Sequence, residues 1–547
     1  MRPTRYSDEM IKDYTAKGYW EDITYSDLYE KNAQSFPHKE AYEDEARCVT
    51  WSKINLEVTR ISAKLIELGL QKDDVVLCHL PNTIDLVLFR VACEKAGLMN
   101  ISAARTLRDQ EIGFILKDTG AKAYVAFKEF RGFDYWDMIS KLKPELPALE
   151  HIFIAGDDVP EGAISINEVI KLPLETKFSK EVFQERKVKY YEVAYVEFTS
   201  GSTGFPKVVE CPLALRTFAA KSHMKRLRMN GDDIVGAFAP ISGAGRPGYF
   251  FPPFVGAKCI LMENFDARDA LQLIQDKKIT IVAVVPTQLI QMLRHPDFDK
   301  FDLSSVKVLN STGAPLPYNV AEEAENRFGC VIINHYGGID AGSVAACDFD
   351  DPTEIRRFAV GKLHVGNEVK LVNKDGGEVP VGEIGEVCFR GPGSVGGYWK
   401  DPEMTKEVWQ DGWFHMGDLG KLDEQGNLMI VGREKQVIIR GGQNIYPTEV
   451  ENVLQNHPKV GVAVVVKMPD PVMGEKACAY IVPRQKENPP KLEEITTYLK
   501  GQGLAPFKCP ERVEIIDSIP LVSDAKVDKP TLEKDILEKL KSENKIS

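Results

Sequence analysis

The sequence predicts an α/β protein with more than one domain. Helical and strand patterns alternate along the chain, as they do in α/β architectures. Three of the predicted strands run directly into glycine-rich loops, and the chain, at 547 residues, is longer than one hydrophobic core usually serves. We therefore expect a large N-terminal domain of α/β sheets with a small β region, followed by a smaller, mobile α+β C-terminal domain.

The order of the patterns supports this division. Residues 54–68 have the apolar spacing of an amphipathic helix, and residues 75–80, 123–127 and 151–155 form short apolar runs typical of buried strands. From Gly382 to Arg433 the chain consists of short β patterns separated by turns, and helices and strands alternate again afterwards. We place the boundary near Lys435, which gives domains of residues 1–434 and 435–547. Residues 534–547 are predicted to form a polar, helical or frayed tail.

Composition excludes several classes of protein. The chain is 43% hydrophobic and 27% charged, with a formal net charge of -12, so it is globular and repels the phosphates of nucleic acids. Its ten cysteines are scattered without a CxxC pair, which argues against a disulfide framework or a cysteine zinc site. The N-terminus lacks the apolar core of a secretory signal, and no segment is long and apolar enough for a bilayer. We expect a soluble cytoplasmic protein, monomeric or homodimeric, without membrane insertion.

Three glycine-rich loops follow predicted strands. Residues 199–207, TSGSTGFPK, have the composition of a phosphate-binding loop, because glycines let backbone amides face a ligand while hydroxyls and Lys207 add donors and charge. The spacing is not that of a Walker A loop. On composition alone, phosphate binding and a plain flexible turn explain this loop equally well. Residues 311–315 follow strand 306–310, and residues 335–338 follow strand 331–334. Because ligands bind beyond the carboxyl ends of such strands, we expect a nucleotide-sized crevice there.

These motifs, in this order, resemble those of the adenylate-forming superfamily, which includes acyl- and aryl-CoA ligases, adenylation domains and beetle luciferases. Residues 199–207 resemble its phosphate loop, and Asn334-His-Tyr-Gly337 its adenine-stacking motif. Gly417-Asp418 resembles the ribose-binding motif, and residues 519–529 resemble the closing motif with the catalytic lysine. The match spans nearly the whole chain. The stretches GLAPFKCPERVE and AKVDK are most similar to stand-alone dihydroxybenzoate-type aryl-acid AMP ligases.

The resemblance implies an ATP-dependent activation of a carboxylic acid, with CoA as the acceptor. ATP and the carboxylate are both anions, so catalysis must neutralise charge, and Lys526 and Lys207 are the implied catalytic cations. Asp418 would accept bonds from the ribose hydroxyls, and Tyr336 would stack on adenine. The implied ATP- and AMP-binding residues are Thr199, Ser200, Gly201, Ser202, Thr203, Gly204, Gly313, Ala314, Pro315, His335, Tyr336, Gly337, Asp418 and Arg433.

The remaining roles follow from the same resemblance. Lys435 would be the hinge about which the small domain changes between an adenylating and a thiol-transferring arrangement. The implied magnesium ligands are Thr203 and Asp340, the implied CoA-tunnel residues are Gly441 and Gly442, and the implied acyl-pocket residues are Ile241, Gly245, Gly313 and Gly338. The implied cofactors are thus ATP, Mg²⁺ and CoA.

Some positions depart from the family pattern. Asp340 and Ala525 stand where the family has glutamate and glycine, and Pro240-Ile241 lacks the His-Asn pair that reads a ring hydroxyl. We therefore predict an apolar cyclic acid, such as benzoate or an alicyclic carboxylate, in a reaction that is reversible in principle. Arg246 could face CoA, form a salt bridge or read a second carboxylate. Alternative functions are a ligase that loads a carrier protein, a fatty acyl-CoA ligase and a nucleotide-binding homologue without catalysis.

Overall fold

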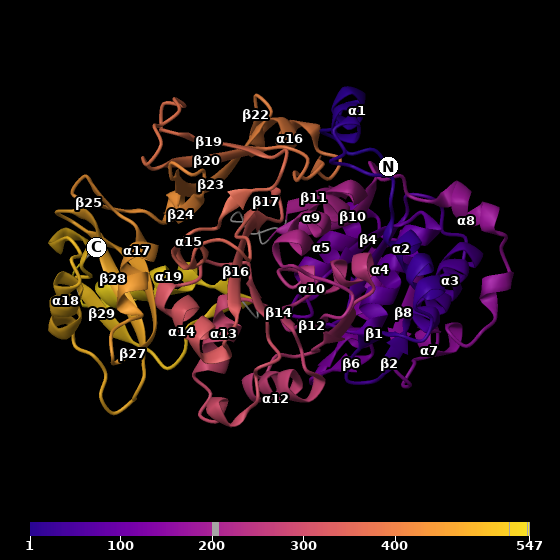
Figure 1. Ribbon diagram of the computed structural model, residues 1–547, viewed down its shortest axis with the longest axis horizontal. Coiled ribbons are helices and arrows are strands. Elements are labelled where there is room, and N and C mark those ends of the chain that lie inside the picture. Colours follow the sequence, from indigo (N-terminus) through magenta and orange to yellow (C-terminus); the bar gives the residue numbers. More distant parts are fainter. Residues whose placement is uncertain (200–206, 524–525, 544, 546–547) are drawn as a thin grey trace.

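The computed structural model describes residues 1–199, 207–523, 526–543 and 545. Figure 1 shows a large N-terminal part, coloured indigo to orange, and a smaller C-terminal part in yellow at one end of the molecule. The predicted fold class, a large domain of α/β sheets with a smaller C-terminal domain, is confirmed by the sheets described below. None of the helices in the described part of the chain combines the length and apolar character that crossing a bilayer requires.

A nine-stranded sheet forms the middle of the large part. Its central strands β13, β12, β14, β15 and β16 are parallel, so their carboxyl ends meet at one edge. The short strands are almost fully buried, as expected where helices cover both faces of a sheet. In sheet order the strands are β18 (Lys362–Leu363), β17 (Gly342–Ala346), β16 (Val331–Gly338), β15 (Val308–Ser311), β14 (Ile281–Val284), β12 (Ile234–Ala237), β13 (Lys258–Leu261), β1 (Glu40–Glu43) and β2 (Cys48–Thr50).

An eight-stranded sheet lies beside it. The early strands predicted from the sequence, β3, β5 and β8, belong here, and the predicted amphipathic helix is α3 (Trp51–Glu67). In order the strands are β21 (Gly397–Tyr398), β11 (Lys207–Pro212), β10 (Val193–Thr199), β4 (Met99–Ser102), β3 (Val75–His79), β5 (Ala123–Phe127), β8 (His151–Ala155) and β9 (Ile164–Ser165). Strands β10 and β11 are antiparallel, and Thr199 pairs with Lys207. The predicted phosphate loop therefore connects two adjacent strands, although residues 200–206 lie outside the described part.

The predicted β region is a five-stranded antiparallel sheet made of β19 (Glu368–Val372), β20 (Gly385–Arg390), β22 (Trp409–Gln410), β23 (Trp413–Leu422) and β24 (Leu428–Arg433). One turn of 3-10 helix, η4 (Glu434–Gln436), links β24 to the C-terminal part. That part has its own sheet and its own buried apolar clusters. Its elements are β25 (Ile438–Arg440), β26 (Gln443–Ile445), α17 (Pro447–Leu454), β27 (Val460–Asp470), β28 (Gly474–Pro483), α18 (Leu492–Gly501), β29 (Arg512–Ile515), β30 (Leu521–Ser523), β31 (Lys526–Val527) and α19 (Lys529–Ser542).

Two segments differ from the prediction. Residues 335–338, expected as a loop, continue β16 and pair antiparallel with β17. The glycines do not break the strand because they allow a close approach there: a Cβ on Gly337 would lie 2.3 Å from the carbonyl oxygen of Gly342. At the C-terminus, α19 is a regular helix that begins earlier than expected, and the Asp528 carboxylate caps it by accepting from the Thr531 amide.

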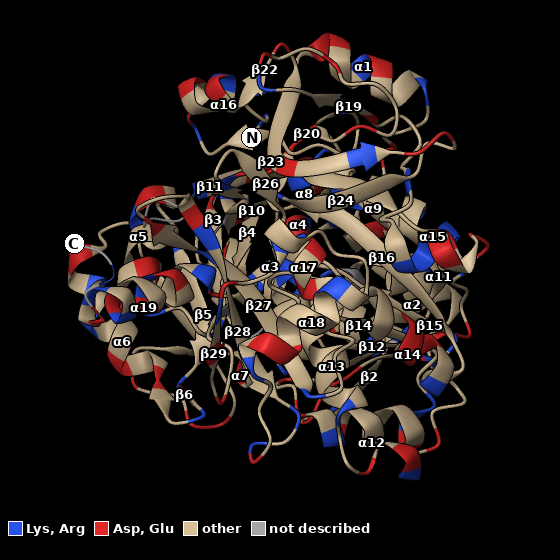
Figure 2. Ribbon diagram, turned by 90° about the vertical axis from the view of Figure 1, so that its left-hand side faces the viewer, with Lys and Arg blue, Asp and Glu red and all other residues tan. Residues whose placement is uncertain are grey.

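Helices α4 (Ile84–Ala96), α9 (Leu213–Arg226), α12 (Ala267–Lys277), α13 (Pro286–Leu293) and α14 (Tyr318–Phe328) belong to the large part. Acidic and basic residues are interspersed along outer helices such as α12 and α19 (Figure 2). Helix α4 instead is buried along nearly its whole length, and it carries Glu94, which is 1% exposed. The Glu94 carboxylate accepts from the Ser26 amide at 2.8 Å and from the Tyr195 hydroxyl at 3.0 Å.

This buried carboxyl makes stability depend on pH. Burial raises the pKa of Glu94 from its ordinary value of 4.5 to about 7. The folded chain therefore binds this proton more tightly than the unfolded chain, so the contribution is present below pH 4.5 and is lost as the pH rises through 7. Glu94→Gln, which mimics the protonated form, should gain about 3 kcal/mol in unfolding free energy relative to the natural chain between these two pH limits. Urea unfolding of both proteins at pH 5 and pH 8 measures this; an equal difference at the two pH values would contradict it.

Candidate active site

The loop after β15 lies at the carboxyl edge of the nine-stranded sheet. Residues 313–315 of this loop are exposed, and Gly313 has a φ of +89°, which favours glycine. A Cβ on Gly313 would lie 3.0 Å from the Cβ of Ala244, in the segment that follows β12. The structure thus brings the predicted adenine loop (Gly313, Ala314 and Pro315) against the segment predicted to line the acyl pocket.

Three predicted nucleotide-binding side chains meet beside this loop. The Tyr336 hydroxyl, from β16, donates to Asp418 Oδ2 at 2.7 Å, and Arg433 Nε lies 2.9 Å from Asp418 Oδ1. Asp418 and Arg433 face one another across β23 and β24. The Asp418 carboxyl is 6% exposed; burial raises its pKa, and the Arg433 guanidinium opposes that shift. Each carboxylate oxygen retains a lone pair, so this group can accept further bonds from a diol.

Two charged side chains, those of Lys207 and Asp340, lie near Tyr398 of β21. The Lys207 Nζ lies 5.2 Å from the centre of the Tyr398 ring. Burial raises the pKa of the Tyr398 hydroxyl, and the neighbouring Asp340 carboxylate raises it further. The predicted phosphate-loop lysine and the predicted magnesium ligand therefore approach the same aromatic side chain.

Hydrogen bonds from a neighbouring side chain hold the segment 239–248, which is predicted to line the acyl pocket. The Asn82 side chain donates to the carbonyl oxygen of Ala239 at 2.9 Å and accepts from the Ile241 amide at 2.8 Å. Ile241 is fully buried, and a Cβ on Gly245 would lie 2.0 Å from the Ala239 carbonyl oxygen, so only glycine fits this turn. Gly245 is therefore required by the backbone of the turn itself.

Arg246 forms a salt bridge, one of the roles left open by the sequence. Its guanidinium pairs with the buried Glu197 carboxylate of β10, and its Nε donates to the Gly243 carbonyl oxygen at 2.7 Å. Arg216 of α9 pairs with the same carboxylate. Although burial favours the protonated acid, Arg216 and Arg246 lower the pKa of Glu197 to about 2. The ion pairs thus tie segment 239–248 to β10, immediately before the predicted phosphate loop.

Residues predicted to act in the C-terminal part lie as follows. Lys435 is in η4, between β24 and β25. Gly441 and Gly442 form the two-residue turn of the β25–β26 hairpin, with φ of 55° and 82°. Lys526 begins β31, which pairs with β30, while its side chain lies outside the described part.

Gly338, predicted for the acyl pocket, lies next to Asp340, since a Cβ there would be 3.3 Å from the Asp340 Oδ1. Ser200, Gly201, Ser202, Thr203 and Gly204 lie outside the described residues.

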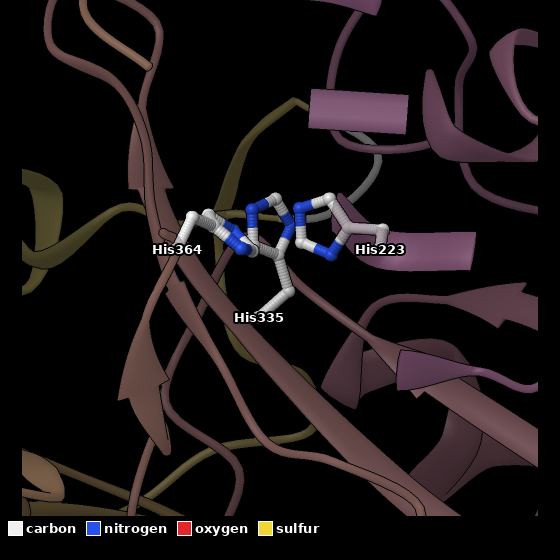
Figure 3. A group of neighbouring side chains, drawn as sticks. All are labelled: His223, His335 and His364. Atoms are coloured by element: carbon white, nitrogen blue, oxygen red, sulfur yellow. The ribbon is translucent and has the colours of Figure 1, made fainter. Parts of the chain in front are cut away.

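Sequence reasoning missed several residues here. The ring of His335, a residue predicted to bind nucleotide, lies against His223 of α9, and His364 lies beside His223 as well (Figure 3). No spacing in the sequence links these three histidines. Asn82 carried no signal either. Glu197 could have been noticed, because a carboxylate within an otherwise apolar strand pattern requires a buried partner.

Comparison with known proteins identifies the family. The family described as AMP-binding enzyme matches residues 29–399, and the AMP-binding enzyme C-terminal domain matches residues 449–526. A 2,3-dihydroxybenzoate-AMP ligase of Bacillus subtilis (strain 168) is 30% identical over 546 residues, covering 98% of each chain. A medium-chain fatty-acid–CoA ligase of Escherichia coli (strain K12) is 28% identical over 542 residues, covering 98% of this chain and 94% of the relative.

Solved structures give the same result. The anthranilate CoA ligase AuaEII, in complex with anthranoyl-AMP, superposes with a TM-score of 0.86 at 25% identity, covering 95% of this chain and 98% of that one. Both domains of the family are thus present in order, and the fold agrees over nearly the whole length. The chain belongs to the AMP-binding enzyme family and is an adenylate-forming enzyme of that superfamily.

Proposed function

We propose that this enzyme is an AMP-forming carboxylate–CoA ligase that activates an apolar cyclic acid, aromatic or alicyclic, and transfers the acyl group to CoA. The observation that carries the proposal is the Asp418 carboxylate, held by Tyr336 and Arg433 beside the exposed Gly313 loop. A buried carboxylate oriented by two donors, next to an aromatic ring and accessible backbone, suits the ribose and adenine of ATP.

The proposed reaction has two steps. A carboxylate oxygen of the acid attacks the α-phosphorus of ATP, and the bond to pyrophosphate breaks, which forms the acyl-adenylate. The thiol of CoA then attacks the acyl carbon; AMP leaves and the thiol loses its proton. Lys526 would neutralise charge in the first step and Lys207 would hold phosphate oxygens. Both steps are reversible in principle.

Magnesium fits the residues around Tyr398. Mg²⁺ binds proteins through one or two carboxylates together with substrate phosphates, and the Asp340 carboxylate lies in this region with Lys207. Asp340 would hold the ion, with Thr203 as the second proposed ligand, and the ion would supply charge neutralisation to the phosphates. CoA would enter beside the exposed Gly441-Gly442 turn, at Gly442, where an added Cβ would meet nothing within 4 Å.

The preference for an apolar acid is supported by how the segment 239–248 is built. The Arg246 guanidinium is paired with Glu197, and the Asn82 amide is bonded to backbone atoms of the segment. These polar groups already have protein partners, so they are not available to a ring hydroxyl. A substrate that brings a hydroxyl into such a pocket loses its hydrogen bonds to water without replacement.

A specific observation favours each of two alternative functions. Transfer to the thiol of a carrier protein is favoured by the 30% identity to an aryl-acid AMP ligase. A fatty acid substrate is favoured by the similarity to a medium-chain fatty-acid–CoA ligase.

Acid-dependent ATP–pyrophosphate exchange tests the proposal. The panel comprises benzoate, cyclohexane- and cyclohexenecarboxylates, hydroxybenzoates, and short and long fatty acids, and CoA is then added to each acid that supports exchange. We expect exchange with an apolar ring acid and thioester with CoA. Exchange without thioester formation would favour a carrier protein as the acyl acceptor. Exchange with fatty acids alone would show that the substrate is a fatty acid and not an apolar ring acid. Measurable ATP binding without exchange for any acid would contradict the proposal.

A further inference from the structure

Three histidines from distant parts of the sequence meet in the large domain. His223 is on α9, His335 on β16, and His364 follows β18. Their ring centres are 4.0 Å apart for His223 and His335 and 4.4 Å apart for His223 and His364. One ligand nitrogen from each ring lies within 4.8 Å of the other two. Figure 3 shows the three rings facing one another between α9 and the β16 region.

The buried ring of His364 indicates that an ion or a water binds beside it. It is 1% exposed, and neither of its ring nitrogens meets a hydrogen-bond partner among the residues that the structure describes. A buried polar atom without a partner is costly, so such a group calls for an unseen ion or water. The other two rings do have partners: the Ser343 Oγ lies 3.1 Å from His223 Nε2 and 3.3 Å from His335 Nε2, and the Thr312 Oγ1 lies 3.4 Å from His335 Nδ1.

Burial disfavours protonation of the three rings. It lowers the pKa of His335 to about 3 and holds the pKa of His223 and of His364 well below the ordinary value. The geometry of the three rings carries the argument for a metal. The positive charges of Arg226, Arg246 and Arg216 disfavour a cation at His335. Arg216 and Arg246 are paired with Glu197, and Asp348 and Asp351 act on Arg226.

We propose that His223, His335 and His364 form a zinc site that joins α9, β16 and the segment after β18. Zinc accepts three histidine ligands in a tetrahedral arrangement with a fourth position open. With Zn–N bonds of about 2.1 Å, the nitrogens around a zinc ion are about 3.4 Å apart. The three histidine nitrogens lie within 4.8 Å of one another, so small side-chain rotations would bring them to that spacing. The Ser343 hydroxyl, within hydrogen-bond reach of His223 and His335, would orient these two rings toward the ion.

The site has a consequence for the nucleotide. His335 and Tyr336 are consecutive residues of β16, so their side chains point to opposite faces of the strand. A metal that fixes the ring of His335 would therefore also fix the backbone that carries Tyr336, the donor to Asp418. This proposal does not depend on which acid or acceptor the enzyme uses.

Metal analysis of the untagged full-length chain tests the site. The protein is stripped with chelator, loaded with zinc chloride, dialysed and analysed by mass spectrometry, and cobalt(II) is added in parallel to read the tetrahedral absorption bands. We expect about one zinc per chain. His364→Gln, which keeps the side-chain volume, should lose nearly all the zinc and the cobalt bands. Ser343→Ala should bind zinc about 10–100-fold more weakly, which tests the site with a smaller change.

His457→Ala is the matched control, because His457 is another buried histidine and lies in the C-terminal part. It should retain the zinc and the cobalt bands, and circular dichroism should show all three variants folded. A natural chain that takes up neither zinc nor cobalt would overturn the proposal. Equal zinc in the natural chain and in His364→Gln would also overturn it, since the ion would then lie elsewhere, for example at Glu386, Cys388 and His415.

Discussion

Replacing Lys526 with alanine should lower acid-dependent ATP–pyrophosphate exchange by at least about 10³-fold, because the charge that offsets the repulsion between ATP and the carboxylate is lost. Thioester formation from acyl-adenylate supplied ready-made should be largely spared, because the proposed second step does not use this lysine. The two half-reactions are measured separately, by exchange of labelled pyrophosphate and by CoA thioester release.

Lys534→Ala is the control for this prediction. Lys534 lies on α19, eight residues further along the C-terminal part, and its side chain is 77% exposed. It should leave both half-reactions unchanged. Equal loss of the two half-reactions in Lys526→Ala would contradict the model in which the small domain adopts two arrangements.

The second large effect is expected at Asp418. Asp418→Ala removes the proposed acceptor of two ribose hydroxyls and leaves the Arg433 guanidinium without its partner. Charge-assisted hydrogen bonds are worth about 1.5–3 kcal/mol each, so the loss of two should lower kcat/KM for ATP about 10²–10⁴-fold. Tyr336→Phe keeps both the ring and the carboxylate, and the loss of one hydroxyl donor should cost only about 3–10-fold.

Steady-state kinetics with ATP and with the acid varied in turn measure these changes. The effect of Asp418→Ala should lie mainly in the KM for ATP. Glu424→Ala, at the exposed tip of the same β23–β24 hairpin, provides the matched control and should be neutral. A rise in the KM for the acid with an unchanged KM for ATP would show that Asp418 serves the acyl group instead of the ribose.

Much of the fold follows from the sequence because its signals are local. Short apolar runs such as 75–79 and 123–127 are buried parallel strands, and their boundaries were predicted within one residue. The continuation of β16 through Gly338 was not predictable, because glycine marks turns in most contexts. Here it serves close packing instead: the strand passes next to Gly342 of β17, where a side chain would collide.

Site residues could be predicted from the sequence only where a suitable side chain lies within a recognisable motif. Tyr336, Asp418 and Arg433 meet as expected, since each lies in a motif with a recognisable neighbour in sequence. The partners of Arg246 and His335 were not predictable. Glu197 is 49 residues from Arg246, and His223 is far from His335 in sequence, so only the tertiary fold brings the members of each pair together.

The position of Arg433 links two parts of the enzyme that are usually considered separately. Arg433 is the last residue of β24 and pairs with Asp418 across the sheet, and η4, with the proposed hinge Lys435, begins at the very next residue. The group that would sense an occupied ribose site is thus two residues from the proposed hinge Lys435. A change in the Arg433–Asp418 pair when nucleotide binds or leaves would therefore reach the proposed hinge through adjacent backbone, without a relay through the protein core.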